Sequence, residues 1–372
     1  MGQRTRPPFR ADQVGSLIRP QALREARQAH LAGKLSAEAL RETEDRHIRE
    51  VIAMQERVGL QAVTDGEFRR TSFREVLFDN VDGFSQERLE TDFAFNYADG
   101  STRRATPVPK VVAPLKRRGA MAAGDFGFLK SNTSRTAKAM LPAPSFAHWF
   151  IGDKALSGST YKDTASYMAD VARVYREEVA ALAALGCGYL QIDEVPIPVM
   201  SDPKVQAIIA RRGEDHGALI DLYVEAINTA IAGRPAGMAV AVHMCRGNEG
   251  VAGLGSSGYA PIAERVFGRL KVDGYLLEFD TERAGDFSAL RYLPKGTTAV
   301  LGLMSTKERA LESKDALKRR VDEAAKVVGI ERLGLCPQCG FATAYHYDRL
   351  TIDDEERKLA RLVEVANEIW GD

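Results

Sequence analysis

Short apolar runs alternate with long amphipathic stretches along the whole chain of 372 residues. This alternation is typical of βαβ units, in which parallel strands are joined by helices that cover the sheet. Apolar residues recur at helical spacing on one face of Tyr161–Leu185 and again on one face of Asp354–Trp370. We therefore expect both stretches to be helices of an outer layer.

Eight strands can be placed between the helical stretches, and eight strands that each precede a helix predict an α/β fold of the (βα)8 TIM-type barrel class. We expect one domain over residues 1–372. The predicted strands are Gln13–Ile18, Ala62–Glu67, Ala139–Leu141, Tyr189–Asp193, Ala239–Met244, Gly274–Phe279, Ala299–Met304 and Arg332–Cys336.

The chain is longer than the roughly 250 residues typical of such barrels. The surplus is interpreted as an insertion after the second strand, at residues 81–135, which are rich in Gly, Asp, Arg and Ser and show no sustained period. One strand, Lys110–Leu115, is predicted inside it. A segment of this length usually serves the site or a subunit contact, so closure over the site and contact within a homo-oligomer both stay open.

Positive and negative charges balance, because Lys plus Arg and Asp plus Glu both number 51. No charge excess indicates nucleic acid or an anionic membrane surface as a partner. The chain has no run of about 18 apolar residues. We therefore expect a soluble, cytoplasmic protein that acts on small molecules.

Barrels of this class carry their chemistry at the carboxyl ends of the strands. Polar residues cluster at those positions in this sequence. They are Gly15-Ser16, Asp65-Gly66-Glu67, Asp193-Glu194, His243-Met244-Cys245, Glu278-Phe279-Asp280 and Cys336-Pro337-Gln338-Cys339-Gly340. The predicted fold brings them to one mouth.

His243 and Cys245 are separated by one residue, so an extended strand end points both side chains to the same side. Cys339 and Glu278 follow other predicted strands and complete a set of one nitrogen, two sulfurs and a carboxylate. This set favours Zn²⁺ over Mg²⁺ or Ca²⁺. A zinc knuckle or a redox pair at Cys336 and Cys339 is disfavoured, because the chain offers no second local ligand pair and no helix opening at this motif.

Zinc would turn a small thiol into a nucleophile. A free thiol has a pKa of about 8.5, so little of it is thiolate at neutral pH, whereas coordination deprotonates it. Glu278, as the weakest of the four ligands, is expected to yield its place to the thiol. Cys187 and Cys336 are expected to be core residues.

Several separated motifs, in order, resemble the C-terminal catalytic domain of cobalamin-independent methionine synthase, especially its single-barrel relatives. They are Val14-Gly15-Ser16, Asp65-Gly66-Glu67-Phe68, Leu190-Gln191-Ile192-Asp193-Glu194, His243-Met244-Cys245, Glu278 and Pro337-Gln338-Cys339-Gly340. The resemblance implies zinc ligands His243, Cys245, Glu278 and Cys339. It also implies that Ser16, Glu67 and Asp193 bind the amino-acid part of homocysteine, and that Trp149 lies near the place of a pterin-stacking tryptophan.

The chain also departs from the two-barrel enzymes of that family. It has no second barrel-sized N-terminal half, which in those enzymes helps to build the folate cleft. Lys307 stands where they carry a histidine thought to act as an acid toward the departing folate. An ammonium with a pKa near 10.4 is a poorer general acid at neutral pH. His148 and His346 are further candidate acids, although hydrogen-bonded structural histidines are commoner.

The main hypothesis is a methyltransferase that methylates homocysteine or a related small thiol, as 5-methyltetrahydropteroyltriglutamate-homocysteine S-methyltransferase does. Its methyl donor would be methyltetrahydrofolate or a methylated corrinoid. Alternatives are alkyl transfer to another thiol from a different electrophile, such as an epoxide, and a zinc- or thiol-binding barrel without turnover. A zinc hydrolase is disfavoured, because two thiolates make the ion a poor Lewis acid.

Overall fold

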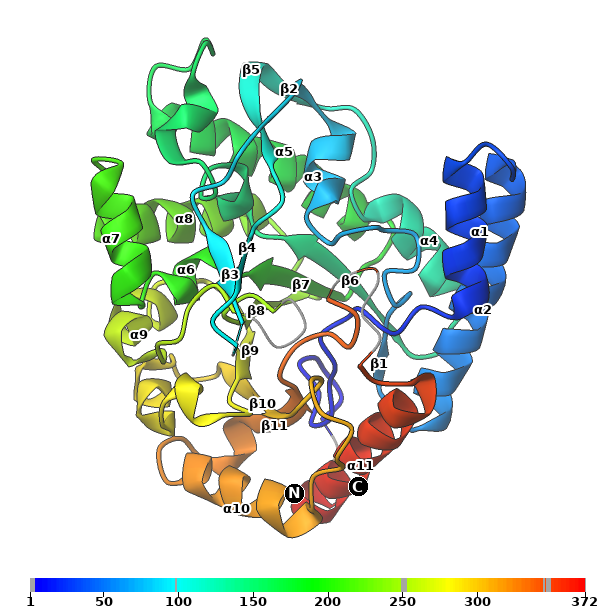
Figure 1. The fold of residues 1–372 in the computed structure, drawn as a ribbon. Helices are drawn as coiled ribbons and strands as arrows, with labels where there is room; N and C mark the ends of the chain where they lie inside the picture. Colours follow the sequence, from blue (N-terminus) through cyan, green and yellow to red (C-terminus); the bar gives the residue numbers. More distant parts are fainter. Residues whose placement is uncertain (1–3, 98, 249–252, 344, 346–348, 372) are drawn as a thin grey trace.

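The computed structural model of the protein describes residues 4–97, 99–248, 253–343, 345 and 349–371. Seven parallel strands form one curled sheet in the order β1-β6-β7-β8-β9-β10-β11, and helices surround it (Figure 1). The strands are β1 (Ala62–Val63), β6 (Thr136–Pro142), β7 (Tyr189–Glu194), β8 (Ala239–Met244), β9 (Gly274–Glu278), β10 (Thr298–Met304) and β11 (Leu333–Pro337). The fold is thus a mixed α/β fold, consistent with a TIM-like barrel.

The helices are mostly amphipathic and bury one face. The α-helices are α1 (Gln21–Leu31), α2 (Ala37–Arg57), α3 (Glu75–Asn80), α4 (Ala123–Ser131), α5 (Thr164–Ala184), α6 (Pro196–Val199), α7 (Pro203–Arg211), α8 (His216–Ile231), α9 (Ala260–Phe267), α10 (Lys314–Ala325) and α11 (Ile352–Trp370). Five short 3₁₀ helices among the described residues are η1 (Pro144–Ala147), η2 (Gly152–Leu156), η3 (Glu282–Ala284), η4 (Phe287–Tyr292) and η5 (Ile330–Arg332). None of the described helices is both long and apolar enough to span a membrane.

The two helices predicted from periodicity are confirmed as α5 and α11. Each begins at a capping box, Asp163 with Ser166 for α5 and Thr351 with Asp354 for α11. In a capping box two side chains satisfy backbone N–H groups that lack a partner within the helix. Sequence patterning and local hydrogen bonding therefore agree on where these helices start.

Seven of the eight predicted strands overlap strands of the sheet, but the first, Gln13–Ile18, is wrong as a strand. Its segment is nevertheless held between the two edge strands. Asp12 N donates to Leu335 O at 2.9 Å beside β11, and Leu17 N donates to Gly66 O at 3.1 Å just beyond β1.

The reason for this difference lies at Gly15. Its φ of 138° departs from strand geometry, and its carbonyl accepts from the Thr64 hydroxyl at 2.8 Å, where a ladder would supply a backbone amide. The segment is extended but cannot form a regular ladder. It still carries Ser16 to the end of the sheet where the metal-ligand candidates lie.

Residues 81–135 are more regular than their sequence suggests. Two antiparallel pairs form there, β2 (Val81–Leu89) with β5 (Val108–Arg117) and β3 (Ala94–Asn96) with β4 (Thr102–Arg104). The predicted strand Lys110–Leu115 lies inside β5. Helix α4, at the end of this segment, contacts β6 and α5 and so belongs to the layer around the sheet. The interpretation of the segment as an insertion stays a prediction.

Candidate metal centre and its cavity

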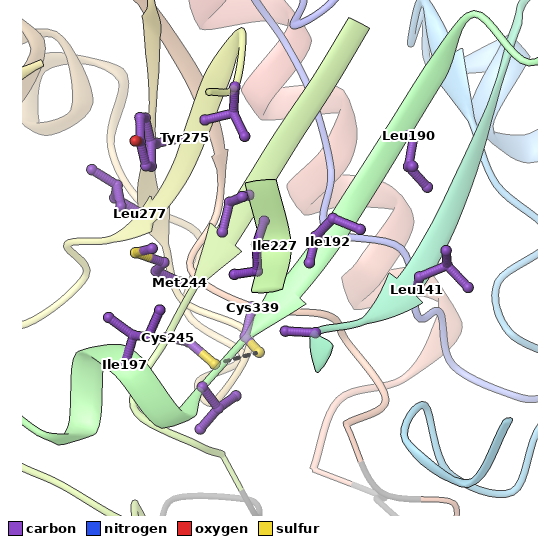
Figure 2. Packing of buried hydrophobic residues seen from close by; sticks show 14 of the residues in the cluster. Leu141, Leu190, Ile192, Ile197, Ile227, Met244, Cys245, Tyr275, Leu277 and Cys339 are labelled. Carbon is purple, nitrogen blue, oxygen red and sulfur yellow. Dashed lines mark hydrogen bonds between the residues drawn. The ribbon is translucent and has the colours of Figure 1, made fainter. Parts of the chain in front are cut away.

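Three side chains with metal-binding atoms meet at the carboxyl ends of two strands. His243 lies near the end of β8, Cys245 follows that strand directly, and Cys339 lies two residues beyond β11. All three are buried, and one ligand atom from each lies within 4.8 Å of the other two. The Sγ atoms of Cys245 and Cys339 are 3.9 Å apart and point toward one another (Figure 2). The predicted juxtaposition of these three residues is therefore present.

The hydrogen bonds of His243 leave one ring nitrogen available for an ion. Its Nδ1 lies 3.2 Å from the carbonyl oxygen of Leu276, which fixes the proton on Nδ1. Its Nε2 is buried and has no hydrogen-bond partner among the described residues. Buried polar atoms are almost always paired, so an atom of this kind marks a place for a ligand. One imidazole nitrogen and two thiol sulfurs form a donor set that fits zinc.

The two cysteines differ in their readiness to ionise. The neighbouring Cys245 thiol, with His243 and the Asn248 amide, lowers the pKa of Cys339 well below its usual range, although burial opposes this. The hydrogen bond to Cys339 and burial raise the pKa of Cys245 well above its usual range. The two pKa values are thus shifted in opposite directions, and a cation placed between the two sulfurs would favour deprotonation of both.

Glu278, the predicted fourth ligand, does not join the group. Its Oε1 accepts from Arg283 Nη2 at 2.5 Å and from Lys307 Nζ at 3.3 Å. Its Oε2 accepts from the backbone N–H of Arg246 at 3.0 Å. Burial alone would raise the pKa of Glu278, but the Arg283, Arg246 and Lys307 cations lower it to about 2. The carboxylate is turned toward these cations, which is why it stands apart from the thiols.

A cavity of about 240 Å³ opens beside the three ligand candidates. The three predicted substrate-binding residues, Ser16, Glu67 and Asp193, line it together with His243, Cys245 and Cys339. Strand pairing explains part of this convergence, since Asp193 of β7 stands opposite His243 of β8 in the parallel register. Six of the residues predicted for the site thus face one space.

Asp193 is buried, and its Oδ1 accepts a hydrogen bond from Gln191 Nε2 at 2.6 Å. Burial raises the pKa of Asp193 to about 7, while His243 lowers it and Glu67 raises it further. Burial likewise raises the pKa of Glu67, against the effects of Arg70 and Arg19. Two carboxyl groups that are costly to ionise alone form a favourable place for a cationic group of a ligand.

The backbone at Glu67 adopts a left-handed conformation, with a φ of 60°, which is uncommon for a residue with a side chain. The Asp65 carboxylate stabilises this turn by accepting from Glu67 N at 2.9 Å. The Asp65 carboxylate thus satisfies a loop amide. The conformation directs the Glu67 side chain into the cavity wall.

Trp149, predicted to contact the substrate, lies instead in the core. Its side chain is fully buried and stacks on Phe93 with ring centroids 3.8 Å apart and an interplanar angle of 11°. It does not line the cavity, whereas Phe146 and Phe150, on either side of it in the chain, do. The short 3₁₀ helix η1 precedes this stretch and turns Trp149 away from the cavity.

Lys307, predicted to be a catalytic acid, is also absent from the cavity lining. Its ammonium group lies 3.3 Å from Glu278 Oε1 and 3.1 Å from Asp280 Oδ2. Two carboxylates hold this ammonium, so its position is that of an ion-pair partner of Glu278.

The two histidines considered as acids have different outcomes. His148 is buried, with Nδ1 2.8 Å from the Tyr223 hydroxyl and Nε2 3.2 Å from Asp153 Oδ1, and it does not line the cavity. It is a hydrogen-bonded structural residue, as the commoner case predicted. His346 lies outside the described residues.

The sequence did not indicate the apolar and basic wall of the cavity. This wall combines aromatic rings and two guanidinium groups, from Phe73, Arg74, Phe95, Arg103, Phe146 and Phe150. Phe95 and Arg103 are cross-strand partners in the β3–β4 pair, so residues 81–135 contribute directly to the site. Apolar residues at strand ends and in irregular loops carry no motif, so only the tertiary structure reveals them.

Residues 9–368 match the sequence model of the family described as cobalamin-independent synthase, catalytic domain. The chain belongs to this family. The family assignment agrees with the resemblance found in the motifs. The match includes His243, Cys245 and Cys339 and every residue that lines the cavity.

Proteins similar to this chain along nearly their full lengths include the uncharacterized proteins YxjH and YxjG of Bacillus subtilis, each 35% identical over 99% of this chain and over 98% and 96% of their own lengths. The 5-methyltetrahydropteroyltriglutamate–homocysteine methyltransferase of Aliivibrio fischeri is 24% identical over 89% of this chain. The aligned part is only 39% of that enzyme, so this chain corresponds to less than half of it.

Two solved structures share the fold along almost the whole chain. The putative vitamin-B12 independent methionine synthase of Listeria monocytogenes has a TM-score of 0.73 and 29% identity, and covers 99% of this chain and 100% of its own. The B12-independent methionine synthase of a Shewanella species, solved in complex with selenomethionine, has a TM-score of 0.73, 21% identity and 97% coverage of both chains. The fold of this chain therefore recurs along almost the whole length of both solved chains.

Proposed function

We propose that this protein is a zinc-dependent methyltransferase that moves a methyl group onto the thiol of homocysteine or a related small thiol and forms a thioether. One observation carries the proposal. The ligand atoms of His243, Cys245 and Cys339 gather on the wall of a cavity that Asp193 and Glu67 also line. The three ligand candidates suit a thiol, and the two carboxyl groups suit an ammonium group. A small amino acid that carries a thiol has both groups.

A catalytic zinc site has three protein ligands and one position for water or substrate. The three ligand candidates match this number of protein ligands. Zinc bound there would supply the positive charge that keeps a substrate thiol deprotonated at neutral pH. The role of the protein is to fix the donors, which the Leu276 carbonyl does for His243. All three side chains are buried in the cavity wall.

Glu278 is proposed as a ligand that yields to the substrate, in line with the family resemblance. The ion pairs of Glu278 with Arg246, Arg283 and Lys307 support this role, because they offer its carboxylate a stable second position. Without such partners, a buried carboxylate released from a metal would be costly. Lys307 then acts by holding Glu278, and we no longer assign it the role of an acid toward substrate.

Asp193 and Glu67 are proposed to bind the ammonium group of the substrate, and Ser16 its carboxylate. Two buried carboxyl groups with raised pKa favour a cationic partner. The Ser16 carbonyl accepts from Phe341 N at 2.8 Å, which fixes this residue beside the loop that carries Cys339. The related Shewanella enzyme was solved with selenomethionine, a selenium analogue of the thioether that we propose as product.

The methyl donor is proposed to enter along the aromatic wall formed by Phe73, Phe95, Phe146 and Phe150. Flat apolar rings suit a planar group such as the pterin of methyltetrahydrofolate. A methylated corrinoid is the second donor to test, because the chain corresponds to only 39% of the enzyme that is named for a folate donor. Another electrophile, such as an epoxide, would need the same thiol site but a different fit to this wall.

The experiment that tests the proposal uses the zinc-loaded protein with homocysteine and, separately, methyltetrahydrofolate and methylcobalamin. Mass spectrometry should detect methionine with at least one donor, and zinc-edge X-ray absorption should show a new sulfur neighbour when homocysteine is added. Binding of homocysteine to zinc without product from either donor would favour alkyl transfer from another electrophile or a non-catalytic thiol-binding protein. Absence of a new sulfur neighbour would contradict thiol activation.

A further inference from the structure

Asn248 follows Cys245 by three residues and lines the cavity beside Cys339. Its Oδ1 accepts a hydrogen bond from Arg283 Nη2 at 3.3 Å. The same Arg283 nitrogen donates to Glu278 Oε1 at 2.5 Å. A guanidinium group only donates hydrogen bonds, so the amide must present its oxygen to Arg283 and its NH₂ group to the other side.

The NH₂ group of Asn248 is the unusual feature. Its Nδ2 atom is buried and forms no hydrogen bond of ordinary geometry with the described residues, although the amide lies close enough to the Cys339 sulfur to lower the pKa of that thiol. A buried donor without a partner is costly, and the exceptions in native structures need a reason. In a substrate cavity the simplest reason is a partner that arrives with the substrate.

The preceding turn holds this amide in place. Gly247 has a φ of 70°, and a side chain there would collide with Leu254, whose backbone N–H donates to Arg246 O at 2.9 Å. The left-handed backbone at Gly247 sets the direction of the chain two residues after Cys245, and Asn248 then lines the cavity together with Cys245 and Cys339. The turn and Arg283 together fix both the position and the rotation of the amide.

We propose that Asn248 is a substrate-binding residue whose Nδ2 donates a hydrogen bond to the sulfur of the bound thiol. A thiolate has lone pairs and negative charge, so an N–H donor beside it both orients the sulfur and stabilises its charge. Arg283 is the positioning residue that keeps the donor side of the amide toward the cavity. This inference rests on the proposed thiol chemistry, since it needs a thiol to bind among His243, Cys245 and Cys339.

The proposed contact of Asn248 is with the sulfur and not with the amino-acid part of the substrate. Its effect can therefore be distinguished from that of Asp193. Loss of the amide should weaken homocysteine and 2-mercaptoethanol alike, because both bring a thiolate. A variant at Asp193 should weaken homocysteine alone, because 2-mercaptoethanol has no ammonium group. The two kinds of residue therefore give different patterns with the same two probes.

The test replaces zinc with cobalt(II) and follows the thiolate-to-metal charge-transfer band as homocysteine or 2-mercaptoethanol is added. Asn248→Ala should weaken both thiols about 10-fold or more, the effect of losing a hydrogen bond to a charged group. Asn248→Ser, which keeps a short donor, should recover part of this loss. Thermal unfolding and competition with a chelator should show an unchanged fold and unchanged metal affinity.

Two results would overturn the inference while leaving the proposed function intact. One is equal thiol affinity in the Asn248→Ala variant and the native protein. The other is weaker metal binding with unchanged thiol affinity, which would assign the amide to Cys339 instead of the substrate. If neither thiol changes the charge-transfer band of the native cobalt-loaded protein, both the proposed function and this inference are wrong.

Discussion

The Sγ atoms of Cys245 and Cys339 lie 3.9 Å apart in space although 94 positions separate the two residues in the sequence. The strands that precede them, β8 and β11, are separated in the sheet by β9 and β10. Their thiols meet only because the sheet curls and the loop after β11 folds back over its end. This single relationship brings a metal centre together from two distant motifs.

Cys339→Ala should lower zinc affinity by more than about 100-fold, because the change removes a direct ligand. Loss of a residue that only hydrogen-bonds to a ligand already lowers metal affinity by about 10- to 100-fold. Competition with a chromogenic chelator measures this. Cys336→Ala is the matched control from the same C-x-x-C motif. Its sulfur is buried and lies near the Val300 carbonyl at 3.7 Å, so zinc affinity should not change. Equal losses in both variants would contradict the assignment of Cys339.

Asp193→Asn should weaken homocysteine binding by roughly 10- to 100-fold, the range for a lost hydrogen bond to a charged group. The amide keeps the shape of the side chain but loses its charge toward the ammonium. Binding of 2-mercaptoethanol, followed on the metal-loaded protein, is the internal control and should stay the same. A similar loss for both thiols would show that Asp193 supports the metal centre and does not recognise the amino group.

Trp149→Phe should lower the free energy of unfolding by about 1–2 kcal/mol and leave the KM of both substrates unchanged, since the ring packs on Phe93 in the core. Phe150→Ala, by contrast, removes part of the cavity wall and should raise the KM for the methyl donor. Chemical denaturation and steady-state kinetics on the two variants separate these roles. A rise in donor KM with Trp149→Phe would restore Trp149 to the substrate site.

Glu355 should make the protein less stable as the pH rises. Burial raises the pKa of this carboxyl to about 8 from an ordinary value of 4.5, and its Oε2 accepts from Ile18 N at 2.8 Å. The folded chain therefore binds the proton more tightly than the unfolded chain. Protonated Glu355 contributes fully to the free energy of unfolding below pH 4.5, and this contribution is lost as the pH rises to about 8 and beyond.

Glu355→Gln keeps the acceptor for Ile18 N but cannot ionise. The variant should be more stable than the native protein at pH 9, by roughly 3–5 kcal/mol at the upper limit set by the shift in pKa. At pH 4 the two proteins should unfold at similar denaturant concentrations. An equal dependence of stability on pH in both proteins would show that Glu355 is not the group responsible.

The order of the strands and the spacing of the ligand motifs were readable from the sequence alone. A strand-end H-x-C pair points both side chains to one side because side chains alternate along an extended chain, and this rule needs no tertiary contact. Parallel strands also bring their carboxyl ends to one side of the sheet. The placement of His243, Cys245, Cys339, Ser16, Glu67 and Asp193 around one cavity follows from these two rules and the family resemblance.

The tertiary structure decided where equally plausible side chains point. Trp149 and Phe150 are neighbours, and only the turn after β6 determines that Phe150 lines the cavity and Trp149 packs in the core. Glu278 follows the strand rule, yet Arg283 in η3, five residues further on, and Lys307 from the loop after β10 engage its carboxylate. Periodicity and motifs describe local geometry, whereas ion pairs and packing depend on segments that meet only in the folded chain. The sequence determined which residues could form the centre, and the fold determined which of them face it.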